Sequence, residues 1–261
     1  MLRGYLLDLD GTVYLGDHLI DGAAETISAL RERGRRIVFL TNKPLYSRAD
    51  YAQKLSNLGI ETSEGDVITS SYVLARYLAD RAAGARVYAI GEPPLLAELE
   101  EVGLSLCDDP KKIEYVIAAF DRTFTYEKLD IGFQAIRRGA HFVATNPDRT
   151  CPVDGGEIPD AAAVIAALEA TTGKKVEVVA GKPSPVIVSV AIDRLGVCRG
   201  ECAMVGDRLE TDMRMARDAG LTGILTLSGV TSRMDLSGSK IQPNYVIESI
   251  AALSDLDAKL N

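Results

Sequence analysis

Short apolar runs alternate along the chain with stretches in which apolar residues recur at helical spacing. The apolar runs are nearly continuous, as is typical of strands buried on both faces of a parallel sheet. These runs are residues 5–9, 36–40, 202–206 and 223–227. Helices are predicted at 23–33, 44–58 and 71–82, with a further helix ending at Ala219. This alternation predicts an α/β fold with a Rossmann-like, doubly wound parallel sheet.

A middle stretch of the chain has strands and helices of its own. Its predicted strands are 86–90, 115–119 and 141–145, and its predicted helices are 95–102, 126–138 and 161–172. We therefore expect residues 84–178 to be an inserted α/β module, with 1–83 and 179–261 forming the main core. Residues 151–159 are rich in Gly, Asp and Pro and predict a loop within the insert.

Composition excludes several classes of protein. The 261 residues are 47% hydrophobic and 25% charged, which is ordinary for a soluble globular protein. A net charge of −8 argues against nonspecific nucleic-acid binding, which needs a basic surface. No apolar run approaches the roughly 20 residues of a membrane span, and no signal peptide is recognisable. We expect a cytoplasmic protein without a nucleic-acid or membrane partner.

Two aspartates end the first apolar run. Asp8 and Asp10 are alternate residues, so on a strand they point to the same side, and Gly11 permits a sharp turn after them. Two like charges this close repel unless a cation or a shared proton intervenes. The pattern predicts a metal site, an acid/base pair or both; the ordinary alternative is a strand end with two solvated aspartates.

Histidine and cysteine chemistry is not indicated. The two histidines have no recognisable catalytic context, and the four cysteines lack the paired spacing of a metal site, so they predict reduced structural thiols. Acid/base chemistry must therefore rest on carboxylates or lysines.

Polar residues follow other strands at the same edge of the predicted sheet. Thr41-Asn42 and Gly206-Asp207 follow apolar runs, and Lys182 lies in the turn Gly-Lys-Pro-Ser-Pro before a helix. Ligands of open parallel sheets bind beyond the carboxyl ends of the strands. Alone, these segments are most often a helix cap, a tight turn and a surface turn. Together, their hydroxyl, amide, ammonium and carboxylate groups suit a phosphoryl group and Mg²⁺.

A count of charges supports the cation. Asp8, Asp10, Asp207 and Asp212 contribute −4, and Lys182 reduces this to −3. A phosphate dianion would be repelled from such a site unless a divalent cation were bound there.

With these motifs the chain resembles a phosphatase of the haloacid dehalogenase superfamily, in its nitrophenylphosphatase-like, NagD-type branch with a large α/β cap. The resemblance covers essentially the whole chain. The segments that carry it are 8–12, 41–42, 182–185 and 206–212, with Ala-Thr-Asn-Pro-Asp at 144–148 matching the cap motif of this branch.

The resemblance implies roles for single residues. Asp8 would be the nucleophile that forms an aspartyl-phosphate, and Asp10 the general acid and then the general base. Lys182 would steady the nucleophile and the transferring charge. Mg²⁺ would be held by the Asp8 carboxylate, the Asp10 main-chain carbonyl and Asp207. Asp212 would orient a metal-bound water or Lys182 from outside the coordination shell.

The implied substrate-binding residues fall into two groups. Gly11, Thr12, Thr41 and Asn42 belong to the motifs that hold phosphoryl oxygens. Lys43 stands where many relatives have asparagine, so it is either a substrate contact or a solvated lysine at a helix start. In the predicted cap, Asn146 and Asp148 would contact the leaving group; the alternative is a turn with no role beyond the fold.

The activity implied is Mg²⁺-dependent hydrolysis of small phosphomonoesters, with sugar phosphates expected and p-nitrophenyl phosphate accepted. Nucleotides or other metabolites are the alternative substrates. The short stretch after Thr12 leaves no room for the small helical cap of a phosphomutase, and Asp10 argues against a dehalogenase. From another class, a noncatalytic phosphate-binding module stays as an alternative, and the family leaves a homodimer open.

Overall fold

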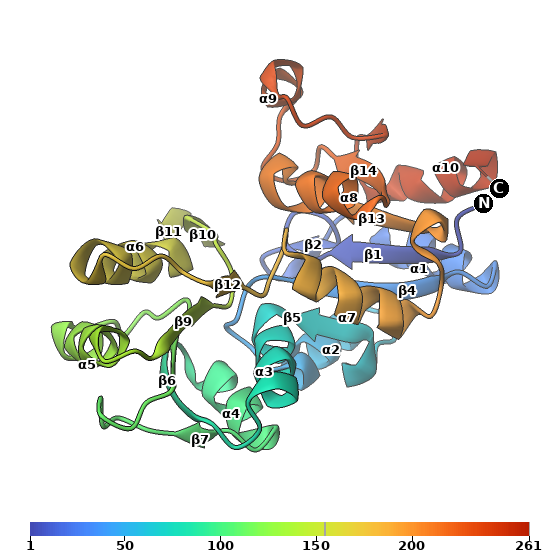
Figure 1. Cartoon of the computed structure of the whole chain (residues 1–261). Coiled ribbons are helices and arrows are strands. Elements are labelled where there is room, and N and C mark those ends of the chain that lie inside the picture. Colours follow the sequence, from blue (N-terminus) through green and yellow to red (C-terminus); the bar gives the residue numbers. More distant parts are fainter. Residues whose placement is uncertain (154, 261) are drawn as a thin grey trace. The chain divides into compact units, whose positions relative to one another are not determined.

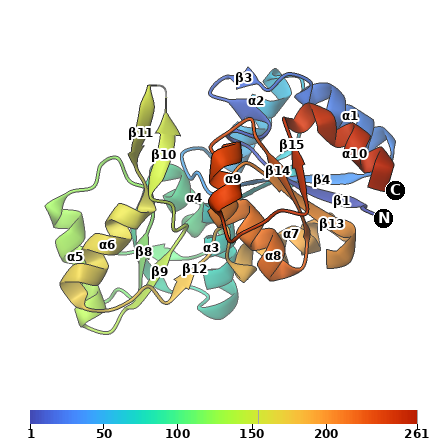
Figure 2. The same cartoon turned by 90° about the horizontal axis from the view of Figure 1, so that it is seen from above.

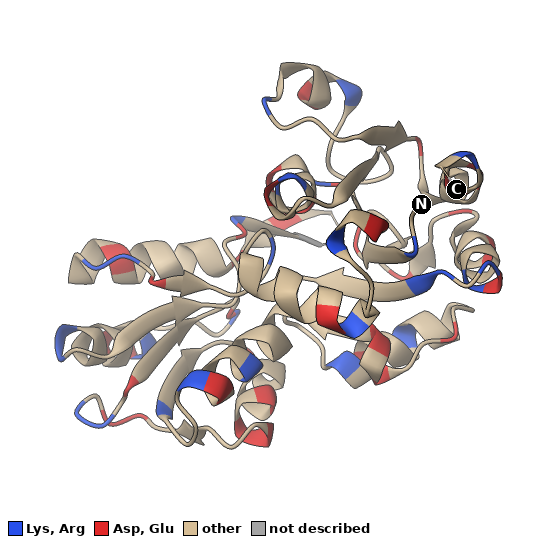
Figure 3. Cartoon of the chain, turned by 45° about the vertical axis from the view of Figure 1, so that its right-hand side comes forward, with Lys and Arg blue, Asp and Glu red and all other residues tan. Residues whose placement is uncertain are grey.

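The computed structural model describes residues 1–153 and 155–260, which form two compact units. The first, here the core unit, comprises Met1–Thr41, Arg48–Ile68 and the chain from Lys182 onward. The second, here the insert unit, comprises Asn42–Ser47 and Thr69–Gly181. Charged residues lie mostly on helices and loops, and the strands are largely uncharged (Figure 3). No helix in the described ranges is long and apolar enough to cross a membrane.

The core unit is built on a sheet with strand order β15-β14-β13-β1-β4-β5. The neighbours from β15 to β4 all pair in parallel. The strands are β1 (Gly4–Asp8), β4 (Arg36–Thr41), β5 (Val67–Thr69), β13 (Cys202–Gly206), β14 (Thr222–Thr226) and β15 (Tyr245–Ile247). This sheet confirms the predicted parallel α/β fold.

Helices cover both faces of this sheet (Figure 2). One face carries α1 (Ala23–Glu32), α2 (Arg48–Asn57) and α10 (Leu253–Leu260). The other carries α7 (Pro185–Leu195) and α8 (Arg214–Ala219). Smaller elements are the hairpin β2 (Tyr14–Leu15) and β3 (His18–Leu19), helix α9 (Arg233–Gly238), and the 3₁₀ turns η1 (Glu64–Asp66), η2 (Arg199–Glu201) and η4 (Ile250–Ala252).

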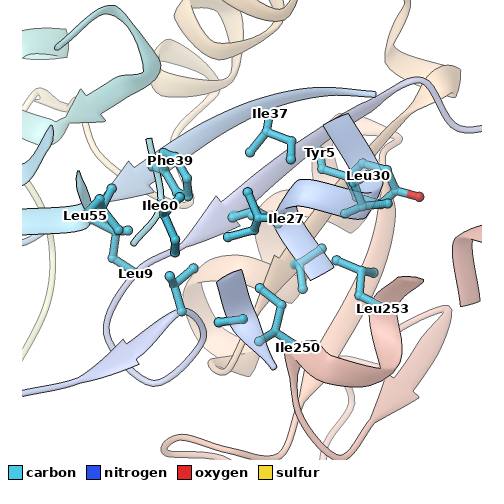
Figure 4. Packing of buried hydrophobic residues seen from close by; sticks show 14 of the residues in the cluster. Tyr5, Leu9, Ile27, Leu30, Ile37, Phe39, Leu55, Ile60, Ile250 and Leu253 are labelled. Carbon is cyan, nitrogen blue, oxygen red and sulfur yellow. The ribbon is translucent and has the colours of Figure 1, made fainter. Parts of the chain in front are cut away.

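Apolar side chains between the sheet and α1, α2 and α10 form the main core (Figure 4). Ile27 of α1 packs here with Phe39 of β4 and Leu253 of α10, and all three are almost fully buried. Burial of one such side chain contributes about 1.5–3 kcal/mol. This packing fixes the positions of β1 and β4, and with them the positions of the residues at their carboxyl ends.

The insert unit has a second parallel sheet, with strand order β12-β9-β8-β6-β7. Its strands are β6 (Arg86–Ile90), β7 (Ser105–Leu106), β8 (Tyr115–Ala118), β9 (His141–Ala144) and β12 (Val178–Val179). Helices α5 (Tyr126–Arg137) and α6 (Ala161–Thr172) lie on one side of it, with α3 (Ser70–Arg81) and α4 (Pro93–Glu101) on the other (Figures 1 and 2).

Two local predictions were wrong. Residues 151–159 form most of an antiparallel hairpin, β10 (Thr150–Val153) with β11 (Gly156–Pro159), because their backbones pair; residue 154 lies outside the described part. Helix α2 begins at Arg48 rather than at residue 44, because residues 42–47 cluster with the insert unit. The helix predicted to end at Ala219 is confirmed: a π-helix, η3 (Leu209–Met213), leads directly into α8.

The boundaries of the insert unit differ from the predicted 84–178. The unit takes in α3, because α3 packs on α4, and it ends at Gly181. The assignment of 84–178 as a substrate cap stays a prediction.

Candidate active site

The predicted site residues of the core unit lie at the carboxyl ends of adjacent parallel strands. Asp8 is the last residue of β1, Thr41 is the last residue of β4, and Asp207 directly follows β13. β1 lies between β4 and β13, so the three strand ends are neighbours. Chain segments far apart in sequence thereby meet at one edge of the sheet. Ligands of open parallel sheets bind at this edge, beyond the carboxyl ends of the strands.

Lys182 joins two of the aspartates. Its Nζ lies 2.5 Å from Oδ1 of Asp8 and 2.7 Å from Oδ1 of Asp212, and all three residues are buried. Burial alone would lower the pKa of Lys182, but the two carboxylates outweigh burial and raise it above its ordinary value. Lys182 is therefore a permanent cation, fixed against the predicted nucleophile.

Three carboxylates form a compact group. Asp8, Asp207 and Asp212 each place an oxygen within 4.8 Å of the others. Oδ2 of Asp207 accepts a hydrogen bond of 2.7 Å from the backbone N–H of Val230, whereas Oδ1 is buried without a partner. Burial, reinforced by the Asp212 charge, raises the pKa of Asp207 to about 6. Burial also raises the pKa of Asp8, opposed by Lys182.

A divalent cation fits this group of residues. Burying a carboxylate oxygen without a hydrogen-bond donor costs several kcal/mol, because the charged group loses its hydration and gains no partner. Oxygen ligands and a net negative charge are what Mg²⁺ selects. The unpaired Oδ1 of Asp207 is the direct structural sign of such a site.

Asp212 is positioned differently from the other two carboxylates. Its Oδ1 accepts from Lys182, and its Oδ2 accepts from the backbone N–H of Arg208 at 3.1 Å. Both oxygens are thus already engaged by protein donors. This arrangement supports the predicted role of Asp212 in orienting Lys182 rather than binding an ion itself.

Glycine is needed where these carboxylates approach the backbone. A Cβ on Gly206 would collide with the Asp212 carboxylate, and one on Gly11 would lie 2.5 Å from Oδ2 of Asp207. Gly11 also has a φ of +86°, a conformation that residues with a side chain rarely adopt. The sequence analysis identified Gly11 as a turn residue, but the structure shows that it also makes room for Asp207.

Asp10 and Thr12 lie next to the nucleophile position on the turn after β1. Asp10 is half-buried, and its Oδ2 accepts a long hydrogen bond of 3.4 Å from the hydroxyl of Tyr14. The hydroxyl of Thr12 donates to Oδ2 of Asp8, also at 3.4 Å. The Asp10 carboxylate is outside the group of three that could hold an ion.

The loop after β14 was missed by the sequence analysis. Ser228 donates a 2.8 Å hydrogen bond to the Gly11 carbonyl, and Val230 donates to Asp207. A Cβ on Gly229 would collide with Asp207. A Ser-Gly pair at the end of a predicted strand was the available signal, because that strand ends at the same sheet edge.

The remaining predicted residues belong to the insert unit, where three of them form a hydrogen-bonded network. Nδ2 of Asn42 and Nδ2 of Asn146 both donate to Oδ2 of Asp148, each at 2.8 Å. Asn146 also donates to Asp160 and accepts from Thr145. The Asn146 amide is therefore fully used within the unit, which favours a positioning role over a substrate contact.

Only one of the two carboxylate oxygens of Asp148 is engaged in this network. Within the described residues its Oδ1 forms no hydrogen bond, and the residue is half-buried. Lys43 is half-buried in the segment 42–47 of the same unit. Of the two predicted cap residues, Asp148 is thus the better candidate for contact with a substrate hydroxyl.

The chain is similar in sequence to known hydrolases along most of its length. The family model for haloacid dehalogenase-like hydrolases matches residues 5–105, and a second, HAD-hydrolase-like model matches residues 179–253. The chain is 37% identical to the sugar-phosphatase AraL of Bacillus subtilis, over 97% of the chain and 92% of that protein.

Solved structures give the same result. A 4-nitrophenylphosphatase from Thermotoga maritima matches with a TM-score of 0.92 at 37% identity, covering 97% of both chains. A glycerol phosphate phosphatase from Mycobacterium tuberculosis, solved with magnesium, matches with a TM-score of 0.89 at 35% identity. That match covers 98% of this chain and 78% of the other.

Proposed function

The chain belongs to the haloacid dehalogenase-like hydrolase family, and from this premise we propose that it is a Mg²⁺-dependent phosphatase of small metabolites. Its relatives confirm two predictions from the sequence: the nitrophenylphosphatase-like branch and the enzyme class, a phosphoric monoester hydrolase. The observation that carries the proposal is the buried contact of Lys182 with Asp8 and Asp212, beside the unpaired Oδ1 of Asp207.

Asp8 is the nucleophile in this proposal. Lys182 holds Oδ1, so Oδ2, which has only the longer contact with Thr12, is the oxygen we assign to attack. Oδ2 bonds to phosphorus, the ester P–O bond breaks, and Asp10 gives its proton to the departing oxygen of the alcohol. The products of this step are the free alcohol and an aspartyl-phosphate on Asp8.

The second step restores the enzyme. Asp10, now ionised, removes a proton from a water molecule, and the water oxygen attacks phosphorus. The bond between phosphorus and Oδ2 of Asp8 breaks, and inorganic phosphate leaves. Lys182 stabilises negative charge in both steps, and the hydroxyl of Thr41 with the backbone N–H of Asn42 would hold phosphoryl oxygens.

The proposed metal ligands are the carboxylates of Asp8 and Asp207 with the main-chain carbonyl of Asp10. Mg²⁺ bound there would offset the −3 balance of the site and the charge of the phosphoryl oxygens. Asp212 has both oxygens engaged and is assigned the orientation of Lys182. The magnesium in the structure of the Mycobacterium tuberculosis relative supports this assignment.

Sugar phosphates are the proposed substrates, because AraL is a sugar-phosphatase and Oδ1 of Asp148 can accept a hydrogen bond from a sugar hydroxyl. Residues 84–178 would act as the cap that contacts the leaving group, with Asn146 holding Asp148 and Lys43 as a further candidate contact. Nucleotides and other metabolites stay as alternative substrates. A cytoplasmic location and a homodimer belong to the same proposal.

The test is release of phosphate from p-nitrophenyl phosphate and from a panel of sugar phosphates, nucleotides and other phosphorylated metabolites. We expect activity to disappear in EDTA and to return with excess Mg²⁺, and we expect a sugar phosphate to have the highest kcat/KM. The Asp8→Asn variant is the control for contaminating phosphatases. Full activity in EDTA would refute the metal assignment, and phosphate binding without turnover would favour the noncatalytic module.

A further inference from the structure

The core unit has a second concave site, at the end of its sheet opposite the catalytic edge. The groove has a volume of about 560 Å³, which is in the range of small-molecule sites. It lies where the start of β4, the C-terminal ends of α1 and α7, and the loop before η1 meet. β4 begins at Arg36 in the groove and ends at Thr41, roughly 17 Å away at 3.3 Å per residue.

Arginines dominate the lining of this groove. The charged lining residues are Arg31, Arg35, Arg36, Arg194, Glu61 and Asp66. Without Arg35, which is paired with Asp257, three positive and two negative charges leave +1, in a chain whose net charge is −8. The floor is apolar, formed in part by the buried side chain of Ile37.

Three of these arginines are not neutralised by carboxylates. Within the described residues, Arg31, Arg36 and Arg194 form no ion pair. Arg31 donates through Nη1 to the Glu61 carbonyl at 2.7 Å, and Arg36 donates through Nη1 to the Leu195 carbonyl at 2.8 Å. A carbonyl fixes one corner of a guanidinium but leaves its charge and its other N–H donors available. Arg35, in contrast, is paired with the buried Asp257 at 3.0 Å.

Within the described residues, the carboxylates of the two acids of the groove form no ion pair with Arg31, Arg36 or Arg194. Asp66 is committed within its own loop, where Oδ2 accepts from the backbone N–H and from the hydroxyl of Ser63. Glu61 is exposed, and its main-chain carbonyl, not its carboxylate, accepts the hydrogen bond from Arg31. Arg36 and Arg194 still face the groove without a carboxylate partner.

We propose that this groove binds a small oxyanion with two or more negative charges, such as the phosphate groups of a metabolite or a polycarboxylate. Guanidinium groups bind such oxyanions through paired, charge-assisted hydrogen bonds. Arg31 and Arg36 are already oriented by backbone carbonyls, which reduces the entropy lost on binding. This site is separate from the proposed catalytic site and does not depend on its chemistry.

The test is isothermal titration calorimetry of the full chain with inorganic pyrophosphate, after metal ions have been removed with EDTA and the EDTA has been dialysed away into metal-free, low-salt buffer. Without a metal ion, the −3 balance of the catalytic carboxylates repels anions, so binding under these conditions reports the groove. Citrate is titrated in parallel, and the tighter of the two probes identifies phosphoryl or carboxyl recognition.

Arg194→Gln is the most direct variant, because Arg194 is exposed and forms no side-chain hydrogen bond within the described residues that its loss could disturb. Arg31→Gln is the second variant. Each should raise the Kd roughly tenfold or more, the effect of losing one charge-assisted hydrogen bond. Arg199→Gln is the matched control: Arg199 is also an exposed arginine of the core unit, and it does not line the groove.

One saturable site in the wild type, weakened in both groove variants and unchanged in Arg199→Gln, would support the proposal. Three results would overturn it. They are no saturable binding of either probe, the same affinity in the groove variants as in the wild type, or an equal loss in Arg199→Gln, which would mean that binding follows net charge.

Discussion

Replacement of Asp207 by asparagine should stabilise the metal-free protein at neutral pH and remove its response to Mg²⁺. Asp207 is almost fully buried, and its Oδ1 has no hydrogen-bond partner, so its charge is held in an unfavourable place in the absence of a cation. Asparagine keeps an oxygen that can accept from the Val230 N–H. The NH₂ group of the asparagine would take the place of the unpaired Oδ1, near Asp212, and it carries no charge.

The expected magnitude follows from the pKa. Burial and the Asp212 charge raise the pKa of Asp207 from 3.8 to about 6. Between these pH values the folded protein binds more protons at this site than the unfolded chain does. Wild-type stability should therefore fall as the pH rises through this window and stay lower above it. At about 1.36 kcal/mol per pKa unit, the full penalty is about 3 kcal/mol.

Asp207→Asn gains less stability than the full penalty if its new amide group is imperfectly hydrogen-bonded. We expect metal-free Asp207→Asn to be about 1–3 kcal/mol more stable than the wild type at pH 8, and equally stable near pH 4. At about 2–4 °C per kcal/mol for a chain of this size, Tm should rise by several degrees.

Urea unfolding in EDTA at pH 4 and pH 8, repeated with Mg²⁺, measures these differences. Mg²⁺ at 100 times its Kd should stabilise the wild type by about 2.7 kcal/mol and should have almost no effect on Asp207→Asn. Asp193→Asn, an exposed aspartate on α7, is the control for loss of a carboxylate and should change little. If Asp207→Asn were less stable than the wild type in EDTA at pH 8, the proposed charge penalty would be refuted.

Three further predictions concern turnover. Asp8→Asn should abolish phosphate release while the circular dichroism spectrum is kept, and ³²P from a labelled substrate should be trapped on Asp8 of the wild type; turnover by the variant would exclude covalent catalysis there. Asp10→Asn should lower kcat by about 10²–10⁴-fold through lost proton transfer, and stopped-flow measurement of alcohol release checks the first step separately. Asp148→Ala should raise KM for the preferred sugar phosphate about 2- to 13-fold and leave KM for p-nitrophenyl phosphate nearly unchanged, and Asn146→Ala should have a smaller effect of the same kind. Equal losses on both substrates would mean that the hydrogen-bonded network serves folding alone.

The sequence by itself determined the parallel α/β architecture and the sheet edge at which the proposed catalytic residues lie. Buried parallel strands are continuous apolar runs, so the runs 5–9 and 36–40 located β1 and β4 without tertiary information. The residues after such runs must lie at one edge of the sheet, which is why Asp8, Asp10, Thr41 and Asp207 could be grouped. The family followed from the same short motifs.

Only the tertiary structure decided which atoms meet. Lys182 reaches Asp8 across 174 positions of sequence, and nothing in its local turn specifies that partner. The same holds for the two engaged oxygens of Asp212 and for the inward-facing amide of Asn146. Hydrogen bonds of this kind depend on the packing of whole elements, whereas periodicity records only which face of its own element a residue occupies.

The limits of the insert unit have a similar cause. Helix α3 has the amphipathic pattern that would suit either unit, and its packing on α4 assigns it to the insert. The hairpin of β10 and β11 was hidden because a Gly- and Pro-rich composition is typical of loops as well as of short paired strands. In both cases the deciding free energy comes from contacts with another segment, which a local sequence pattern does not contain.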